Sequence, residues 1–206
     1  MMYRAAGLRL TFGLMTTALL ATPMETQAQM SQPSAANQVV DVLIEIPARG
    51  QVKYEIDKAT GRPRVDRFIA PGLSYPANYG YVPGSCAGDG DPLDALVLTR
   101  VALLPGVLIE AQVIGVLRMR DAGDDDAKLI AVPLASMDVI DPSAGAFSGL
   151  ADIDELPASV RAEIEAFFLA YKRAADGSTP VQLSGFGDAT EAAEQVSAAL
   201  ARSDCR

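Results

Sequence analysis

From Val39 onward, the apolar residues of this chain come in short runs that end at turn-forming glycine, proline or aspartate residues. Apolar or alternating runs of this length between turns are typical of β-strands. The short spacing and the Gly and Pro turns favour a small β-barrel over a parallel sheet. The predicted strands are residues 42–46, 53–56, 64–69, 95–98, 109–119 and 127–132.

Two helices are predicted late in the chain, where the apolar residues follow a helical spacing. Pro157 suits the first turn of the earlier helix, whose apolar face carries Val160, Ile164, Phe167, Phe168 and Tyr171. The later helix begins near Asp188, has Glu191 as a capping-box partner and runs towards Leu200. The predicted fold is therefore mainly β with flanking α: a β-barrel with two C-terminal helices packed outside.

The first 28 residues have the order of a secretory signal peptide. Arg4 and Arg9 precede an apolar run over residues 10–21, and small and polar residues follow up to Ala28. The run is shorter than the ~20 apolar residues that span a bilayer, so no stable membrane association is expected after cleavage. Residues 29–38 are predicted as a flexible lead-in to a single domain over residues 39–206. The protein is thus expected to be exported to the periplasm. One alternative is that the segment is retained as an N-terminal anchor. The other is a mis-assigned start codon, and in that case the protein would stay in the cytoplasm.

Composition excludes several kinds of site. The chain of 206 residues has no histidine and two cysteines, which excludes histidine general bases, serine–histidine triads and zinc sites built on histidine or paired cysteines. With 17 Lys and Arg against 26 Asp and Glu, the net charge is -9, so nucleic acid is not an expected partner. Any catalysis must therefore use carboxylates, lysine, arginine, tyrosine or a metal ion held by oxygen ligands.

Two acidic segments lie at the ends of predicted strands. The first carries Asp89, Asp91 and Asp94, and the second carries Asp121, Asp124, Asp125 and Asp126. If the fold brings them together, cations must offset their repulsion, because carboxylates a few ångströms apart otherwise become protonated. Mg²⁺ with oxygen ligands is the natural partner. Taken singly, each segment also fits a solvated acidic turn, and the spacing of a calcium-binding EF-hand is absent.

Other charged residues and tyrosines stand among the predicted strands. Glu45 lies inside an apolar run, where an unpaired carboxylate would be costly. Lys53 and Glu55 point to the same side of one strand. Arg67 lies beside an aspartate among apolar neighbours, and three tyrosines at positions 75, 79 and 81 lie on a predicted loop before the first acidic segment. Each of these alone fits a salt bridge or a core tyrosine, but their occurrence with two acidic segments favours a site.

Seven segments of the chain carry these residues: Ile44-Glu45-Ile46-Pro47, Lys53-Tyr54-Glu55-Ile56-Asp57, Val65-Asp66-Arg67-Phe68, Tyr75-Pro76-Ala77-Asn78-Tyr79-Gly80-Tyr81, Asp89-Gly90-Asp91-Pro92-Leu93-Asp94, Asp126-Ala127-Lys128 and Tyr171-Lys172. In order and spacing they resemble soluble inorganic pyrophosphatases of family I, over about residues 39–185. The segment D-G-D-P-x-D is the signature of that family, so the resemblance is specific.

The resemblance implies a five-stranded OB-like barrel with the site at its mouth. It also implies that inorganic pyrophosphate is hydrolysed to two orthophosphates by a metal-activated water, with several Mg²⁺ ions per site and Asp91 as the general base. The implied metal ligands are Asp89, Asp94, Asp121 and Asp126, with Glu45 and Glu55 at outer or additional positions. The implied phosphate-binding residues are Lys53, Arg67, Tyr79, Lys128, Tyr171 and Lys172, with Tyr75 in the pocket wall.

Three features depart from this family. Ala122 stands where bacterial members usually carry an acidic residue after Asp121, so the third metal position is in question unless Asp124 or Asp125 replaces that residue. The resemblance implies a homo-oligomer, in bacteria a hexamer, but the helix around Phe167 lacks the histidines that are frequent in bacterial homologues. An export signal is atypical, because the family is mainly cytoplasmic.

Two other functions and one question about the cysteines stay open on the sequence. The chain could be a non-catalytic module of the same fold that binds metal or phosphate. It could also be a related phosphohydrolase that acts on nucleotides or polyphosphate. Cys86 and Cys205 permit one disulfide in an exported protein, or they remain two free thiols.

Overall fold

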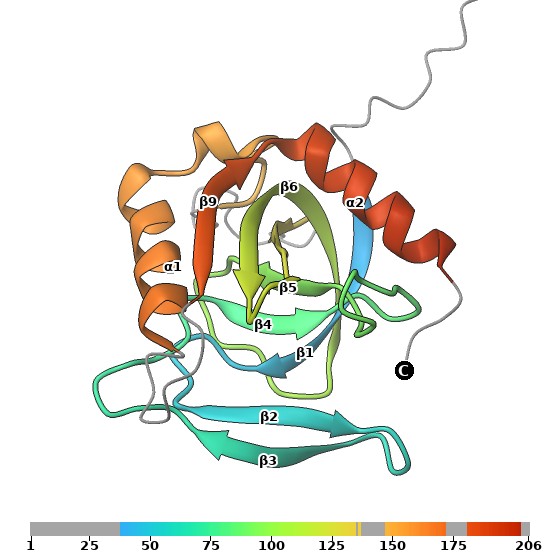
Figure 1. The fold of residues 1–206 in the computed structure, drawn as a ribbon, viewed down its shortest axis with the longest axis vertical. Helices are drawn as coiled ribbons and strands as arrows, with labels where there is room; N and C mark the ends of the chain where they lie inside the picture. Colours follow the sequence, from blue (N-terminus) through green and yellow to red (C-terminus); the bar gives the residue numbers. More distant parts are fainter. Residues whose placement is uncertain (1–37, 135, 137–146, 172–180, 203–206) are drawn as a thin grey trace, which may run out of the picture. The chain divides into compact units, whose positions relative to one another are not determined.

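A computed structural model of the chain describes residues 38–134, 136, 147–171 and 181–202. Five strands of this region close into a ring (Figure 1), and in ring order they are β1 (Val39–Ile46), β4 (Asn78–Tyr81), β5 (Asp94–Val97), β8 (Lys128–Pro133) and β6 (Leu108–Asp121). Each strand pairs with the next, and β6 returns to β1. The β5–β8 pairing is parallel and the other pairings of the ring are antiparallel. The predicted barrel is confirmed.

Strand β6 closes the ring because it is long enough to pair with two neighbours. Residues 108–112 pair with β1, and residues 111–117 pair with β8. The β6–β8 register shifts between Val113 and Gly115, and such a bulge bends a strand. A Cβ atom on Gly115 would lie 2.7 Å from the Cβ of Ile153 and 2.8 Å from the carbonyl oxygen of Gly187, so a side chain does not fit at this bend.

A separate two-stranded sheet is formed by β2 (Val52–Asp57) and β3 (Arg62–Phe68), both of which are predicted from the sequence. Their turn is held by the Asp57 carboxylate, which accepts hydrogen bonds from the backbone N–H and the hydroxyl of Thr60 at 2.9 and 2.8 Å. Every residue of β3 is exposed. Within the described residues, no ladder of backbone hydrogen bonds joins this hairpin to the ring.

Besides the two-residue β7 (Asp124–Asp125), the sequence misses two strands and places one of them in a loop. The segment with Tyr79 is predicted as a loop but forms β4, a member of the ring. Asn78 and Gly80 obscure this strand because both residue types are depleted in strands. Gly80 is required, since a Cβ there would lie 2.0 Å from the carbonyl oxygen of Leu43. The other missed strand, β9 (Gln182–Gly187), pairs with β6 and contains few apolar residues.

The two predicted helices are α1 (Ala158–Tyr171) and α2 (Ala189–Ala201), and they lie outside the ring (Figure 1). A short 3₁₀ turn, η3 (Ile153–Glu155), precedes α1, which buries Ile164, Phe167 and Phe168. The carboxylate of Asp188 caps α2 by accepting the Glu191 N–H at 2.8 Å, as predicted. The carboxylate of Glu191, expected to complete a capping box, pairs with Arg118 of β6. In the described parts of the chain, no helix is long and apolar enough to cross a membrane.

Candidate active site

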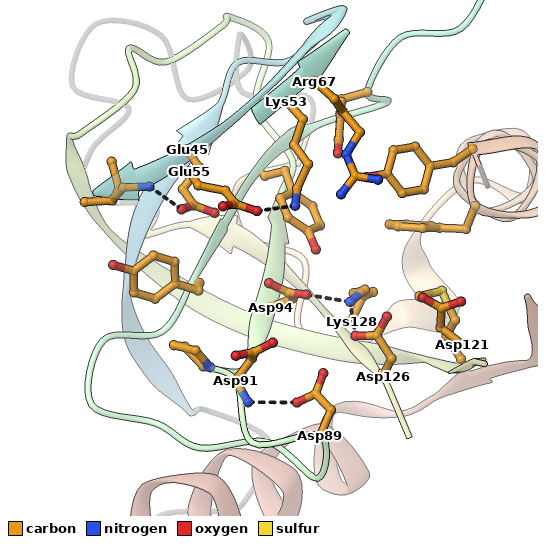
Figure 2. A pocket seen from close by; sticks show the side chains of 18 of the residues that line it. Glu45, Lys53, Glu55, Arg67, Asp89, Asp91, Asp94, Asp121, Asp126 and Lys128 are labelled. Atoms are coloured by element: carbon orange, nitrogen blue, oxygen red, sulfur yellow. Dashed lines mark hydrogen bonds and ion pairs between the residues drawn. The ribbon is translucent and has the colours of Figure 1, made fainter. Parts of the chain in front are cut away.

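One pocket of about 500 Å³ opens between the ring, the β2–β3 hairpin and the end of α1. Every site residue predicted from the sequence that the structure describes lines this pocket, many of them labelled in Figure 2: Glu45, Lys53, Glu55, Arg67, Tyr75, Tyr79, Asp89, Asp91, Asp94, Asp121, Asp126, Lys128 and Tyr171. Lys172 lies outside the described residues. The fold therefore brings together the two acidic segments and the predicted cations.

The first acidic segment is the loop between β4 and β5. Asp89 Oδ1 accepts the backbone N–H of Asp91 at 3.0 Å, and the carbonyl oxygen of Asp91 accepts the N–H of Ala87 at 2.7 Å. Gly90 between the two aspartates has φ of 86°, in the left-handed region that glycine adopts without strain. These bonds fold the loop tightly, so that both carboxylates face the pocket.

The base of this loop is held by a residue that the sequence does not single out. Ser85 is buried, its Oγ accepts the Leu93 N–H at 2.8 Å, and its hydroxyl donates to the carbonyl oxygen of Val82 at 2.6 Å. Next to it, the N–H of Cys86 donates to the carbonyl oxygen of Ala199 on α2 at 2.8 Å. Helix α2 is thus hydrogen-bonded to the start of the acidic loop. A serine in a loop carries no sequence signal for this role.

The second acidic segment is the turn from β6 through β7 (Asp124–Asp125). Asp121 pairs across this turn with Asp124, and the Asp126 N–H donates to the carbonyl oxygen of Met119 at 3.0 Å. Ala122 sits in the turn with φ of 53°. Asp121 and Asp126 line the pocket, whereas Asp124 and Asp125 are exposed outside its lining. Neither Asp124 nor Asp125 therefore replaces, in the pocket lining, the acidic residue that bacterial members usually carry at the position of Ala122.

Lys128 joins the two acidic segments. Its side chain is 3% exposed, and its Nζ lies 2.5 Å from Asp94 Oδ2 and also pairs with Asp126 Oδ1. Burial alone would lower the pKa of Lys128, but the charges of Asp94 and Asp126 outweigh burial and raise the pKa. The lysine is therefore a permanent cation at neutral pH. It supplies part of the positive charge that the sequence argument assigned to metal ions alone.

Replacing Lys128 by methionine is expected to lower the free energy of unfolding of the metal-free protein by about 2 kcal/mol. Removal of one partner from a fully buried ion pair costs ~3–5 kcal/mol. The expected loss is smaller here because Asp94 and Asp126 remain 26% and 18% exposed. Urea denaturation of both proteins measures the difference. The control Arg62→Met removes an exposed cation of β3. An equal loss of unfolding free energy in both variants would refute the stabilising role of the buried ion pairs of Lys128.

Two cations reach the pocket from the strands of the hairpin, and an aspartate pairs with both of them. Lys53 Nζ lies 2.6 Å from Glu55 Oε1 and 3.3 Å from Asp66 Oδ2. Arg67 Nε donates to the same oxygen of Asp66 at 2.8 Å. Asp66 is not among the predicted site residues, although the sequence shows it beside Arg67. Its role becomes visible only when β2 and β3 pair.

Glu45 is the buried carboxylate that the sequence marks as costly. It is 8% exposed, and its Oε1 accepts the backbone N–H of Ile56 at 2.9 Å. Burial raises the pKa of Glu45 to about 7, although the hydrogen bond from Ile56 acts in the opposite direction. The carboxylate therefore has a partner, and this partner is the backbone of the hairpin.

An aromatic wall closes the pocket beside α1. The ring of Tyr75 lies 4.7 Å from that of Phe167, 5.3 Å from that of Tyr79 and 5.9 Å from that of Tyr171, between centroids. Burial raises the pKa of Tyr75 and of Tyr79, with the charge of Asp94 adding to the effect. Both phenols therefore stay protonated and can donate hydrogen bonds. Tyr81 and Lys58 also line the pocket, although the sequence argument gave them no role in it.

The pocket residues that could bind a metal ion do so through carboxylate oxygens, and oxygen ligands of this kind fit hard divalent cations. In the described residues, no three acidic side chains are arranged to hold one metal ion by themselves. Mg²⁺ commonly takes one or two protein carboxylates and keeps several waters or binds substrate phosphates. The pocket therefore suits Mg²⁺ ions that are completed by water and by an anionic ligand, and does not resemble a closed calcium cage.

Comparisons with known proteins agree on one family. A family model described as inorganic pyrophosphatase matches residues 42–204. An inorganic pyrophosphatase of Sulfolobus acidocaldarius is 43% identical over 84% of this chain and 96% of its own length. One from Gluconobacter oxydans is 43% identical over 79% of this chain and 90% of its own length.

Solved structures give the same result for the fold. An inorganic pyrophosphatase from Coxiella burnetii superposes with a TM-score of 0.72 at 36% identity, and the match covers 79% of this chain and 94% of the other. The inorganic pyrophosphatase from Thermus thermophilus has a TM-score of 0.71 at 36% identity, with 88% and 96% of the two chains covered.

Proposed function

Because this chain belongs to the inorganic pyrophosphatase family, it hydrolyses inorganic pyrophosphate to two orthophosphates, and we propose that it does so with Mg²⁺ in the pocket described above. The observation that carries this proposal is the convergence of five aspartates with Lys53, Arg67 and Lys128 around one cavity. Such a cavity suits a small, highly charged anion that arrives with cations. Phosphoryl transfer needs positioning and charge neutralisation more than a protein nucleophile, which fits a chain without histidine.

Each group of residues has a proposed task. Mg²⁺, held by Asp89, Asp94, Asp121 and Asp126 with Glu45 and Glu55 at outer positions, would offset the charge of pyrophosphate and acidify a water molecule. Asp91 accepts the proton of the attacking water, as its exposed carboxylate faces the pocket from the tight loop. The set Lys53, Arg67, Lys128, Tyr79 and Tyr171 donates hydrogen bonds to phosphate oxygens. Lys172, by its place in the family motif, joins this set.

The intact site argues against the first alternative, a module that only binds, and one assay tests both alternatives. A module that only binds metal or phosphate could lose Asp91 without penalty, yet this aspartate lies in an intact loop at the pocket. Phosphate release should be measured with pyrophosphate, ATP and tripolyphosphate, each with and without Mg²⁺. We expect rapid release from pyrophosphate in Mg²⁺ and little from the other two. Faster release from ATP or tripolyphosphate would favour a broader phosphohydrolase, and no release from any of them would favour a binding module.

We also propose that the protein is exported to the periplasm after cleavage behind Ala28, and that it forms a homo-oligomer, a hexamer by family resemblance. Residues 1–28 lie outside the described residues, so the support is the order of charged, apolar and small residues in that segment. N-terminal sequencing of periplasmic protein that starts at Gln29 would support export. A protein that keeps Met1 in the cytoplasm would refute it. Light scattering gives the assembly state.

The pairing of Cys86 and Cys205 is a separate question, with two free thiols as the alternative. Cys205 lies outside the described residues, but Arg202 donates from Nη1 to the carbonyl oxygen of Cys86 at 3.1 Å. Mass spectrometry of periplasmic protein, alkylated without reduction, decides between the two, because neither cysteine is modified if the bond forms. Two alkylated cysteines would mean that the bond is absent.

A further inference from the structure

The β2–β3 hairpin carries three of the charged groups of the pocket but is not part of the ring. Lys53, Glu55 and Arg67 all belong to it. Their ion pairs run within the hairpin, from Lys53 to Glu55 and from Lys53 and Arg67 to Asp66. These side chains are therefore fixed relative to one another. Their position relative to the aspartates depends on how the hairpin as a whole is attached to the ring.

Backbone hydrogen bonds fix only the base of the hairpin. The Tyr75 N–H donates to the carbonyl oxygen of Gly50 at 3.0 Å, and the Arg49 N–H donates to the carbonyl oxygen of Tyr75 at 2.8 Å. Beyond that base, the described residues show no ladder between β2 and the ring. The outer half of the hairpin needs another attachment if its cations are to stay over the pocket.

Glu45 provides that attachment. It lies on β1, a strand of the ring, and its Oε1 accepts the N–H of Ile56 near the outer end of β2 at 2.9 Å (Figure 2). A backbone N–H at the edge of β2 that loses its partner is costly, and a carboxyl oxygen can accept its hydrogen bond in either charge state. The Glu45 carboxylate thus accepts the hydrogen bond that a backbone carbonyl of a neighbouring strand would otherwise accept.

We propose that Glu45 is a positioning residue whose carboxylate fastens the hairpin to the ring, so that Lys53 and Arg67 face Lys128 across the pocket. This role rests on the proposed binding of pyrophosphate in the pocket. It acts through the backbone of Ile56, and it is distinct from the outer metal position that the family resemblance gives to Glu45. It also gives the buried side chain of Glu45, within the apolar run of β1, a hydrogen-bond partner.

Two variants separate positioning from metal binding. Glu45→Ala removes the acceptor and is expected to raise the KM for pyrophosphate at least about tenfold, since small misplacements of binding groups are costly. The same variant should speed hydrogen exchange of the Ile56 amide about tenfold or more, without substrate or metal present. Glu45→Gln keeps an acceptor oxygen without the charge. It should restore the slow exchange of the Ile56 amide in the metal-free protein, because an amide oxygen can still accept this hydrogen bond.

One control variant and two possible outcomes test the positioning role of Glu45. Asp41→Ala removes an exposed carboxylate from the same strand and should change neither quantity. If the Ile56 amide of the metal-free protein exchanges as fast in Glu45→Gln as in Glu45→Ala, an acceptor oxygen at position 45 does not hold the hairpin, and the positioning role is refuted. Unchanged Ile56 exchange in Glu45→Ala refutes it as well. Failure of the wild type to hydrolyse pyrophosphate would instead contradict the proposed function, so the two failures are distinguishable.

Discussion

Replacing Asp91 by asparagine is expected to lower kcat for pyrophosphate hydrolysis at least about 100-fold, the lower end of the range for a lost general base. An amide cannot accept the proton of the attacking water. The hydrogen bonds that Asp91 makes within the loop come from its backbone and not from its side chain. Its backbone N–H donates to the Asp89 carboxylate, and its backbone carbonyl oxygen accepts from the Ala87 N–H. The variant should therefore keep its fold and most of its metal binding. Steady-state phosphate release and thermal denaturation measure both quantities.

A matched control is Asp41→Asn, which makes the same change at an exposed aspartate of β1 outside the pocket. Its kcat should equal that of the wild type. Near-normal turnover of Asp91→Asn would move the role of base to another carboxylate of the pocket. A large fall in melting temperature together with the loss of activity would mean that Asp91 supports the loop instead.

Removal of metal is expected to abolish hydrolysis completely and reversibly. Without divalent ions, pyrophosphate would meet a pocket in which the carboxyl groups of five aspartates and two glutamates outnumber the four cations Lys53, Lys58, Arg67 and Lys128. Mg²⁺ should also raise Tm, because an ion that binds only the folded state stabilises it by ~2.7 kcal/mol at 100 times its dissociation constant. For a protein of this size, that corresponds to a shift of roughly 5–10 °C.

The metal-induced shift has its own test in Asp94→Asn. Asp94 is one of the proposed ligands and the partner of Lys128, so the variant should lose most of the shift in Tm. Asp41→Asn should keep it. Activity that survives exhaustive chelation would refute the metal-dependent mechanism. An equal shift in Asp94→Asn and in the wild type would remove Asp94 from the ligand set.

The sequence predicts the strands that follow an apolar or alternating pattern and misses those that do not. Strands β1, β2 and β6 lie where their side-chain patterns indicate. Strand β4 contains Asn78, which is fully buried and bonds to Ala48, Leu103 and Thr99 through its side chain. A buried asparagine and a glycine that lies against β1 are needed for tertiary reasons. Local propensity therefore could not reveal β4.

The site follows the same division. The aspartates, lysines and tyrosines of the family motifs that the structure describes line one pocket, and their roles there stay predictions. The contacts between motifs could not be predicted from spacing. Lys128 pairs with Asp94 from a distant segment, Asp66 ties Lys53 to Arg67 across a hairpin, and Ser85 fastens the acidic loop from below. These contacts depend on the strand register, which the sequence does not contain as a local signal.

The most direct test of the account is a crystal structure of Asp91→Asn with Mg²⁺ and pyrophosphate, because slow turnover should preserve the substrate. The account predicts pyrophosphate in the pocket with its oxygens bonded to the cations of the hairpin and to Lys128. It also predicts Mg²⁺ ions on carboxylates of both acidic segments. Pyrophosphate bound elsewhere on the chain, or in this pocket without any metal ion on Asp89, Asp94, Asp121 or Asp126, would contradict it.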